Sequence, residues 1–266
     1  MHPIERLRYV ARSGQGDPRM MVHETASALR GLRLDPAGVV LACRRIIERH
    51  PTCGPLWWLS AQLMVAPEPF DASRNLAEHI VEDPTADRLV ELIPPDATVC
   101  VVGWPDLTAE ALARRGDVRS LVVDAGGEGA DLVRRLHRAD LEAETVAGEA
   151  VAAAVTAADL VLVEPLAVGT DTALARTGSH AAAAVAHAMG RPVWMVLPRG
   201  RCLPPMLWAG MVQRWETTGA LWERTVEQVP WTLVSHVVTS EGVAPTAAAP
   251  RPECPDTVEL LRSSAM

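Results

Sequence analysis

The sequence contains no lysine, and all 25 basic residues of the 266-residue chain are arginine. This absence excludes every mechanism that needs a lysine amine: a Schiff base, a Walker-type phosphate-binding lysine or a lysine general base. An alanine-rich, all-arginine composition is also what a GC-rich coding sequence produces. The chemical exclusion holds whatever its cause.

Long apolar runs and paired cysteines are absent as well. No stretch reaches the roughly 18 apolar residues of a membrane span, and the first residues, MHPIERLRYVARSG, lack the apolar core of a secretory signal. The cysteines are odd in number and form no CxxC pair, which predicts reduced thiols in a cytoplasmic protein without membrane association. They are Cys43, Cys53, Cys100, Cys202 and Cys254.

An excess of basic charge is also lacking. The formal net charge is −8 and the sequence pI is near 5.5, which argues against a nucleic-acid partner bound through bulk electrostatics. A local basic pocket stays possible. The length allows one large domain or a helical portion joined to an α/β domain.

Residues 1–93 are predicted to form a helical domain. Segments such as PAGVVLACRRIIERH, GPLWWLSAQLMVA and SRNLAEHIVED carry apolar residues at spacings of three and four, as amphipathic helices do. No strand-like run occurs before residue 90. Prolines between residues 51 and 55 separate two of these helices.

Residues 94–243 are predicted to form a Rossmann-like α/β domain. Short apolar runs alternate with helical segments: ATVCVVG, RSLVVDAGG, ETVAG, DLVLVEP and RPVWMVLP are the expected strands. This alternation is typical of βαβ units and a doubly wound parallel sheet with helices on both faces. Residues 203–235 are expected to be a tryptophan-rich covering segment. Residues 244–266, which include APTAAAPRPECPD, are expected to be a partly disordered tail.

Ligands of such sheets bind beyond the carboxyl ends of the strands. The sequence places four segments there: Gly103–Asp106, Asp124–Gly127, Glu164–Asp171 and Pro198–Arg201. The loop between the fourth strand and the next helix therefore lies on the ligand side of the sheet.

That loop, residues 166–178, is the candidate anion site. Gly169 and Thr170 lie within it, and Gly178 and Ser179 precede a helix whose free N–H groups attract anions. Arg176 could add a bidentate phosphate contact, and Ser179 could cap the helix. The alternative is an ordinary loop followed by a capped helix, since the spacing matches neither a Walker nor a GxGxxG motif.

Acidic residues near the strand ends are candidates for proton transfer. Asp124 could instead be a turn residue before its two glycines, whereas Glu164, at the end of a buried strand, is as suited to function as to structure. The catalytic candidates are Asp124, Glu164, Asp171 and His180. We expect no metal site, because no acid or cysteine partner for the histidines follows from spacing.

The order of these segments resembles the alpha, beta and delta subunits of initiation factor 2B and the related methylthioribose-1-phosphate and ribose-1,5-bisphosphate isomerases. The resemblance covers roughly residues 20–245. It is carried by ERHPTCGPLWWLSAQLM, ATVCVVGWPDLTAEALARRG, SLVVDAGGEGADLVRRL, AADLVLVEPLAVGTDTALARTGSHAAAAVAHAMGRPVWMV and VPWTLVSHVVTSEGVAP.

The resemblance implies an N-terminal helical domain, a Rossmann-like (NagB/RpiA-like) parallel-sheet domain and a homodimer. The isomerases use a cysteine and an aspartate, and their positions correspond here to Gly103 and Leu166. Both groups are therefore missing, as is an arginine after the second strand. This departure favours a protein without catalytic activity.

Three functions stay open. The preferred hypothesis is a non-catalytic regulatory or sensor protein that binds a phosphorylated metabolite, a sugar phosphate or a nucleotide, without a further cofactor. The alternatives are an aldose–ketose isomerase acting on a phosphorylated sugar, and a protein-interaction subunit whose tryptophan-rich residues 194–231 bind a partner. The expected ligand-binding residues are Gly103, Trp104, Asp124, Glu164, Gly169, Thr170, Asp171, Arg176, Gly178 and Ser179.

Overall fold

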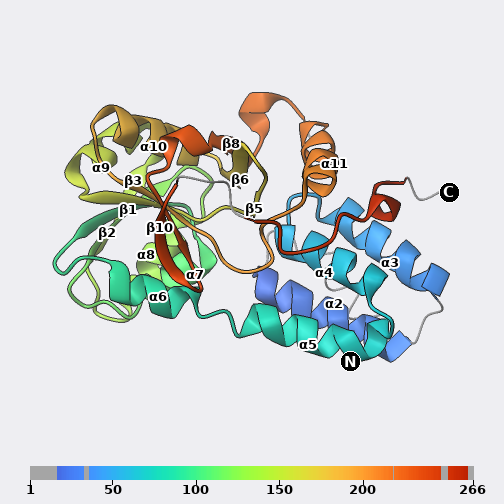
Figure 1. Cartoon of the computed structure of the whole chain (residues 1–266). Coiled ribbons are helices and arrows are strands. Elements are labelled where there is room, and N and C mark those ends of the chain that lie inside the picture. Colours follow the sequence, from blue (N-terminus) through green and yellow to red (C-terminus); the bar gives the residue numbers. More distant parts are fainter. Residues whose placement is uncertain (1–16, 33–35, 218, 247–250, 263–266) are drawn as a thin grey trace.

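Four helices form the first part of the computed structural model, which describes residues 17–32, 36–217, 219–246 and 251–262. They are α2 (Pro18–Leu32), α3 (Pro36–Arg49), α4 (Gly54–Val65) and α5 (Pro69–Val81), labelled as in Figure 1. Helix α4 is apolar all round its surface, so it lies buried in the middle of this helical half. Pro55 in its first turn has a φ already suited to a helix.

The helical half also receives two later segments of the chain. Helix α11 (Pro205–Glu216) packs Leu207, Met211 and Trp215 into the same core. The 3-10 turn η4 (Val258–Leu261) adds Leu260, and Cys254 joins the core nearby. Figure 1 shows both segments against the helices that come from the N-terminal part.

The sheet half contains a seven-stranded sheet in the order β10-β9-β7-β4-β1-β2-β3. Every neighbouring pair is parallel except the β9–β10 hairpin. The strands are β1 (Thr98–Val102), β2 (Arg119–Asp124), β3 (Ala143–Ala147), β4 (Leu160–Val163), β7 (Val193–Val196), β9 (His236–Thr239) and β10 (Gly242–Pro245). The predicted α/β class is confirmed, and the first five of these strands overlap the five that the sequence predicts.

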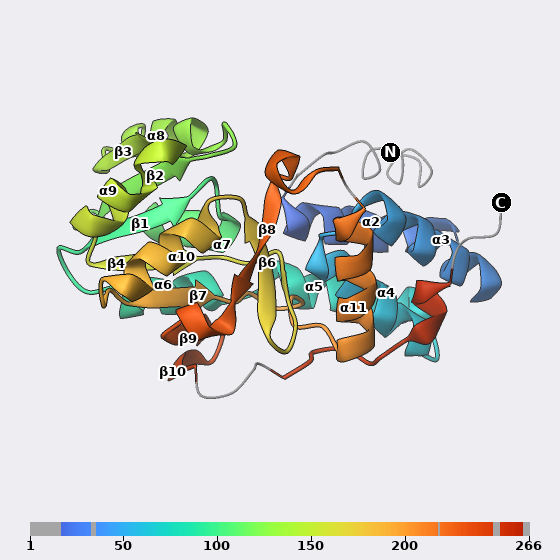
Figure 2. The same cartoon turned by 90° about the horizontal axis from the view of Figure 1, so that it is seen from above.

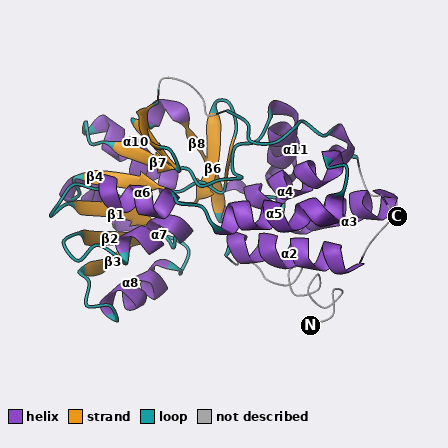
Figure 3. Ribbon diagram, turned by 60° about the horizontal axis from the view of Figure 1, so that its bottom comes forward, coloured by secondary structure: helices purple, strands orange, loops and turns teal. Residues whose placement is uncertain are grey.

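Helices cover both faces of the sheet because its strands are apolar on both sides. Val99 and Val101 of β1 face α6 (Thr85–Leu92), α7 (Asp106–Leu112) and α8 (Gly129–His137), which Figure 3 shows lying over the strands. Cys100 and Val102 face the opposite layer, made by α9 (Val151–Ala157) and α10 (Ser179–Ala188). Cys100 is thus a buried strand residue, as its sequence context suggests.

A second, three-stranded sheet lies between the two halves, as Figure 2 shows. It consists of β5 (Ala167–Val168), β6 (Thr172–Arg176) and β8 (Val226–Pro230), all antiparallel. The sequence predicts an open loop over residues 166–178, so this part of the prediction is wrong. The apolar residues of TALAR alternate over only five positions, which is too short a pattern to distinguish a strand from a loop.

The hydrophobic cores divide the chain differently from the predicted domain boundaries. Helix α6 falls within residues 1–93 but packs on the sheet, and α11 falls within residues 94–243 but packs on the helices. Within the expected tail, residues 251–262 lie against the helical half, where the indole of Trp58 and the amide of Gln62 each donate to the carbonyl of Glu253 at 3.0 Å. These bonds and the burial of Leu260 explain why this part is ordered.

None of the described helices combines the length and the apolar character needed to cross a bilayer. All five cysteines are free thiols.

Candidate functional site

A cleft of about 330 Å³ opens where β1 and β2 end, next to the start of α2. Parallel strands direct their carboxyl ends and the following loops to one edge, so this is the edge at which the sequence places a ligand. Of the described residues, four carboxylates, three guanidinium groups and one indole line the cleft. They are Asp17, Asp106, Glu128, Asp131, Arg19, Arg135, Arg176 and Trp104.

Gly103 and Arg176, both predicted site residues, come together here. Gly103 has a φ of +64°, which favours glycine, and a Cβ at this position would lie 2.9 Å from Cδ of Arg176. The arginine side chain therefore crosses the space above Gly103 and forms an ion pair with Glu128. A cysteine at position 103, as in the isomerases, would occupy that path.

Trp104 and Arg135 form one wall of the cleft. The guanidinium carbon of Arg135 lies 5.8 Å from the centre of the Trp104 ring, in cation–π contact. Trp104 is partly buried against the core beneath the cleft. A fixed aromatic face beside a guanidinium group suits a ligand that has both a flat or apolar surface and an anionic group.

Asp106 begins α7 and lies deeper in the cleft. Its side chain is 20% exposed, and its Oδ2 lies 3.6 Å from a terminal nitrogen of Arg201, a contact between charges that is longer than a hydrogen bond. Burial, and secondly the charge of Glu164, raise the pKa of Asp106 to about 7, although Arg201 acts in the opposite direction. Near neutral pH this carboxyl can therefore both give and accept a proton.

Glu164 is buried, and its carboxylate is fully used by structural contacts. It accepts hydrogen bonds from the amides of Leu107 (3.4 Å) and Thr108 (2.8 Å), from the Thr108 hydroxyl (2.9 Å) and from Arg201 (2.8 Å). The amide bonds place this carboxylate at the N-terminus of α7, where the helix dipole favours a negative charge. Glu164 thus fixes α7 and does not line the cleft.

Asp124 is a turn residue, the alternative that the sequence leaves open for it. Its Oδ1 accepts hydrogen bonds from the amides of Gly127 at 2.7 Å and Gly129 at 3.1 Å. These bonds shape the loop that carries Glu128 into the cleft.

Gly169, Thr170 and Asp171 form the turn between β5 and β6, away from Arg176. The indole of Trp208 packs on Gly169 so closely that a Cβ there would lie 2.4 Å from the ring, and Trp231 donates to the Gly169 carbonyl at 3.0 Å. The four residue steps of β6 separate this turn from Arg176 by about 13 Å. The predicted ligand set therefore falls into two groups at opposite ends of one strand.

The N-terminus of α10 lies at the Arg176 end of that strand. Gly178, with a φ of +98°, is the N-cap, so Ser179 is the first helical residue and the predicted serine cap is wrong. Ser179 is buried. The backbone amide of the exposed His180 donates a hydrogen bond to Oε1 of Glu227 at 2.7 Å. The carboxylate of Glu227, a residue of β8, thus lies at the helix N-terminus where the sequence predicts the anionic group of a ligand.

Several cleft residues were not singled out from the sequence. Asp106 lies within a predicted strand-end segment, and Glu128, Asp131 and Arg135 follow the second strand. Arg19, 84 residues before Gly103, gave no signal, because only the contact between the two halves brings it to the cleft. Within the described ranges, histidine, cysteine and acidic side chains nowhere gather in a group of three or more that could hold a metal ion.

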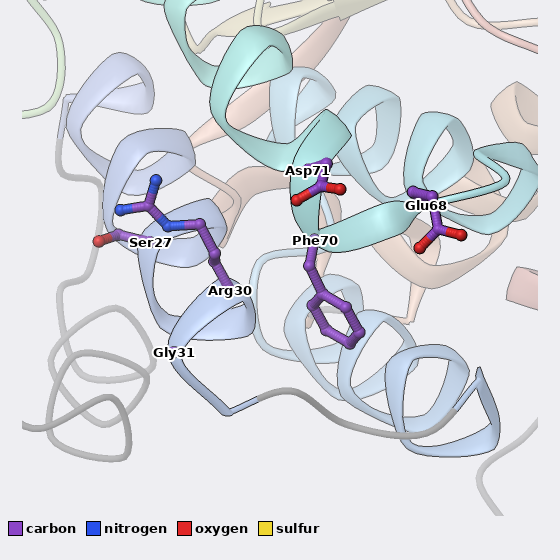
Figure 4. Close-up of a pocket in the computed structure, with 6 residues that line it drawn as sticks. All are labelled: Ser27, Arg30, Gly31, Glu68, Phe70 and Asp71. Carbon is purple, nitrogen blue, oxygen red and sulfur yellow. The ribbon is translucent and has the colours of Figure 1, made fainter.

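A second hollow, of about 640 Å³, lies on the helical half. Figure 4 shows Ser27, Arg30 and Gly31 of α2 on one side of it and Glu68, Phe70 and Asp71 near the start of α5 on the other. None of the residues predicted from the sequence lines it.

The fold and the cleft together define a two-part α/β architecture, a helical domain beside a Rossmann-like sheet whose carboxyl edge faces it. This is the fold of the subunits of translation initiation factor 2B. No family model matches the chain, and no curated protein matches it either.

The solved structures carry this assignment. The Pyrococcus horikoshii OT3 translation initiation factor eIF-2B superposes with a TM-score of 0.77 at 16% identity, over 91% of this chain and 96% of that one. For eIF2B beta of Chaetomium thermophilum the TM-score is 0.70 at 16% identity, over 92% and 88%. A chain of the tetrameric eIF2B-beta2-delta2 complex of the same organism gives 0.72 at 18%, over 92% and 90%. The resemblance seen in the sequence is thus confirmed at the level of the fold.

Proposed function

We propose that this protein is a non-catalytic, regulatory or sensor protein that binds a phosphorylated metabolite in the cleft at the carboxyl ends of β1 and β2. The observation that carries the proposal is the lining of that cleft: three arginines beside an indole and several carboxylates. Guanidinium groups bind phosphate through paired hydrogen bonds, and carboxylates accept bonds from sugar hydroxyls. A sugar phosphate or a nucleotide offers both kinds of group.

The absence of catalysis is proposed from the positions that the isomerases use. Gly103 leaves no nucleophile under Arg176, and Leu166 is partly buried against the helical core, with its carbonyl bonded to the amide of Gly54 at 3.1 Å. Asp124 and Glu164 are held in structural contacts, which leaves neither as a mobile base.

A thermal-shift screen tests ligand binding. Ribose 5-phosphate, glucose 6-phosphate, AMP, ADP and inorganic phosphate are each added to the purified protein, and a ligand at 100 times its Kd is expected to stabilise by about 2.7 kcal/mol. Arg176→Ala should abolish the shift. Arg74→Ala, an exposed arginine of α5 paired with Glu78, is the matched control and should keep it. A flat screen would contradict the proposal.

The runner-up is an aldose–ketose isomerase acting on a phosphorylated sugar. Asp106 favours it, since a carboxyl with a pKa near 7 in a cleft is suited to general acid–base work. Solvent deuterium incorporated into a bound sugar phosphate at C1 or C2, and lost in Asp106→Asn, would support the isomerase. No exchange into any sugar phosphate would dismiss it.

Protein contacts are the third part of the proposal. Trp215 and Trp231 are buried, but Trp222 is 86% exposed, on the connection between α11 and β8. An exposed indole suits a protein interface, and the neighbour from Chaetomium thermophilum comes from a tetrameric complex. We propose a homodimer in a reducing, cytoplasmic compartment, in keeping with the five free thiols. A mass near twice 28.6 kDa by light scattering supports the dimer, and 28.6 kDa contradicts it.

A further inference from the structure

The charges of the cleft do not balance when every group is ionised. Among the described residues, four carboxylates line it against three guanidinium groups, so the lining itself carries one net negative charge, and Arg134, which pairs with Asp131, stands outside this count. An approaching dianion would then be repelled, because like charges in a partly buried site are weakly screened. Binding of a phosphate becomes favourable if one of the four carboxyls is neutral.

Asp106 is the carboxyl whose surroundings favour the neutral form. Asp131 is paired with Arg134 and is 52% exposed, and Glu128 is paired with Arg176. Asp17 is exposed, and Nε of Arg19 lies 3.7 Å from it, a contact as long as the one between Asp106 and Arg201. Asp106 is the most buried side chain of these four, with 20% of its surface exposed against 37% to 52% for the other three.

Arg201 compensates the charge of Asp106 only in part. One terminal nitrogen of its guanidinium binds Glu164 at 2.8 Å and the other binds the carbonyl of Pro165. Its Nε is buried and finds no hydrogen-bond partner among the described residues. Arg201 thus divides its charge between Glu164, which it binds directly, and Asp106, which lies 3.6 Å away without a hydrogen bond from it.

Among the described residues, the charged groups around Asp106 come from several elements. Asp17 and Arg19 lie at the start of α2, Glu164 and Arg201 follow β4 and β7, and Arg176 ends β6. Asp83 and Arg199 line a small cavity with Asp106, and Glu110 of α7 binds Arg19 at 2.9 Å. Burial raises the pKa of Asp106 most, Glu164 and Asp17 raise it further, and Arg201 and Arg176 lower it, which brings the pKa to about 7. Asp106 lines the cleft together with Arg19 and Arg176.

We propose that the cleft binds a phosphate monoester together with one proton, which stays on Asp106 and forms a hydrogen bond to an oxygen of the ligand. The inference rests on the proposed function. The proton comes from solvent, so above pH 7 each ligand bound removes about one proton from the buffer. Affinity then falls by about tenfold for each pH unit above 7, because only the protonated site binds well.

Calorimetry with ribose 5-phosphate tests this on the wild-type protein. Titrations at pH 8 in two buffers of different ionisation enthalpy give the number of protons taken up. At this pH the phosphate itself is a dianion, since its second pKa is near 6. We expect close to one proton per ribose 5-phosphate, and a Kd that rises about tenfold from pH 8 to pH 9.

Asp106→Asn replaces the carboxyl with a neutral group of the same shape. This variant should bind ribose 5-phosphate without proton uptake and with a Kd that is constant between pH 7 and pH 9. Asp87→Asn, which removes an exposed carboxylate of α6 outside the cleft, should follow the wild type. The thermal unfolding midpoint of each variant checks that it is folded.

The outcomes separate this inference from the proposed function. Binding by the wild type without proton uptake overturns the role of Asp106 and leaves the proposed function intact. Proton uptake that persists in Asp106→Asn overturns it as well, because another group then holds the proton. Failure of the wild type to bind ribose 5-phosphate, the other screened phosphates or inorganic phosphate at any pH from 6 to 9 contradicts the proposed function itself, and this inference with it.

Discussion

Glu164 and Asp106 lie at the same edge of the sheet, but they differ in the hydrogen bonds they accept and in their access to the cleft. Glu164 accepts four hydrogen bonds, including a direct bond from Arg201 at 2.8 Å, whereas Asp106 lies 3.6 Å from the same guanidinium group. The first is a closed structural contact and the second is open to the cleft. The number of donors already bound, more than position at a strand end, separates the structural acid from the one proposed to act in the cleft.

The largest effect is expected when the ion pair between Arg201 and Glu164 is broken. Arg201→Met leaves Glu164 buried without its cation, and loss of one partner of a buried pair costs about 3–5 kcal/mol. Urea denaturation should show this loss of unfolding free energy. The double variant Arg201→Met with Glu164→Gln should recover part of it, because the uncompensated charge is gone. A loss below about 1 kcal/mol in the single variant would show that the pair contributes little.

The next effect is the dependence of the unfolding free energy on pH that Asp106 causes. The pKa of Asp106 in the folded protein, about 7, lies above its ordinary value of 3.8. Between pH 4 and 7 the folded state therefore binds more protons than the unfolded state, and the unfolding free energy falls as pH rises, by up to about 1.4 kcal/mol per unit from this group. Above pH 7 its contribution is constant.

Asp106→Asn removes that dependence. The difference in unfolding free energy between the variant and the wild type should grow in the variant's favour from pH 4 to pH 7, measured by urea denaturation at each pH. Parallel curves for the two proteins would show that the carboxyl titrates normally.

A smaller effect is expected on the cleft wall. Arg135→Ala should weaken the binding of ribose 5-phosphate by about ten- to a hundredfold, as expected for one charged hydrogen bond of about 1.5–3 kcal/mol. Stability should change by less than about 1 kcal/mol, since its contact with Trp104 is exposed. Arg138→Ala, one turn later and outside the cleft, should bind as the wild type does. Equal Kd values for all three proteins would remove Arg135 from the site.

The smallest effect tests the space under Arg176. Gly103→Ala places a Cβ 2.9 Å from the arginine side chain at a positive φ, and should destabilise by about 1–2 kcal/mol. Gly126→Ala meets no described atom within 4 Å and is the control. A Tm measured by calorimetry should fall for the first variant and stay nearly constant for the second. An unchanged Tm for both would contradict the close approach at position 103.

The sequence predicted the repeating part of the fold and the edge that carries the cleft. Apolar runs such as ATVCVVG and DLVLVEP are long enough to indicate buried strands, and their order fixed the side of the sheet on which Gly103, Trp104 and Arg176 would meet. The function of Glu164 could not be predicted, because its role depends on Arg201, 37 residues later in the chain.

Short or distant elements explain the remaining differences. The two residues of β5 are too few to show a period, so the sequence alone does not separate the turn at Gly169 from the site. Arg19 reaches the cleft only through the packing of α2 beside the sheet, which no local pattern of the sequence encodes. Strands β9 and β10 are likewise too short to show a period, so the sequence does not predict their hairpin.

The helical core is built from both ends of the chain: Trp57 of α4 stacks beneath Arg214 of α11, at 5.1 Å, and Leu260 lies in the same core. During synthesis on the ribosome the last of the four early helices ends at Val81, and α11, which covers part of their apolar surface, begins only at Pro205. The helical core is then expected to be complete only when residue 260 has left the exit tunnel. A stop codon only a few residues before position 260 would leave the first-made helices as the exposed, aggregation-prone part of the molecule.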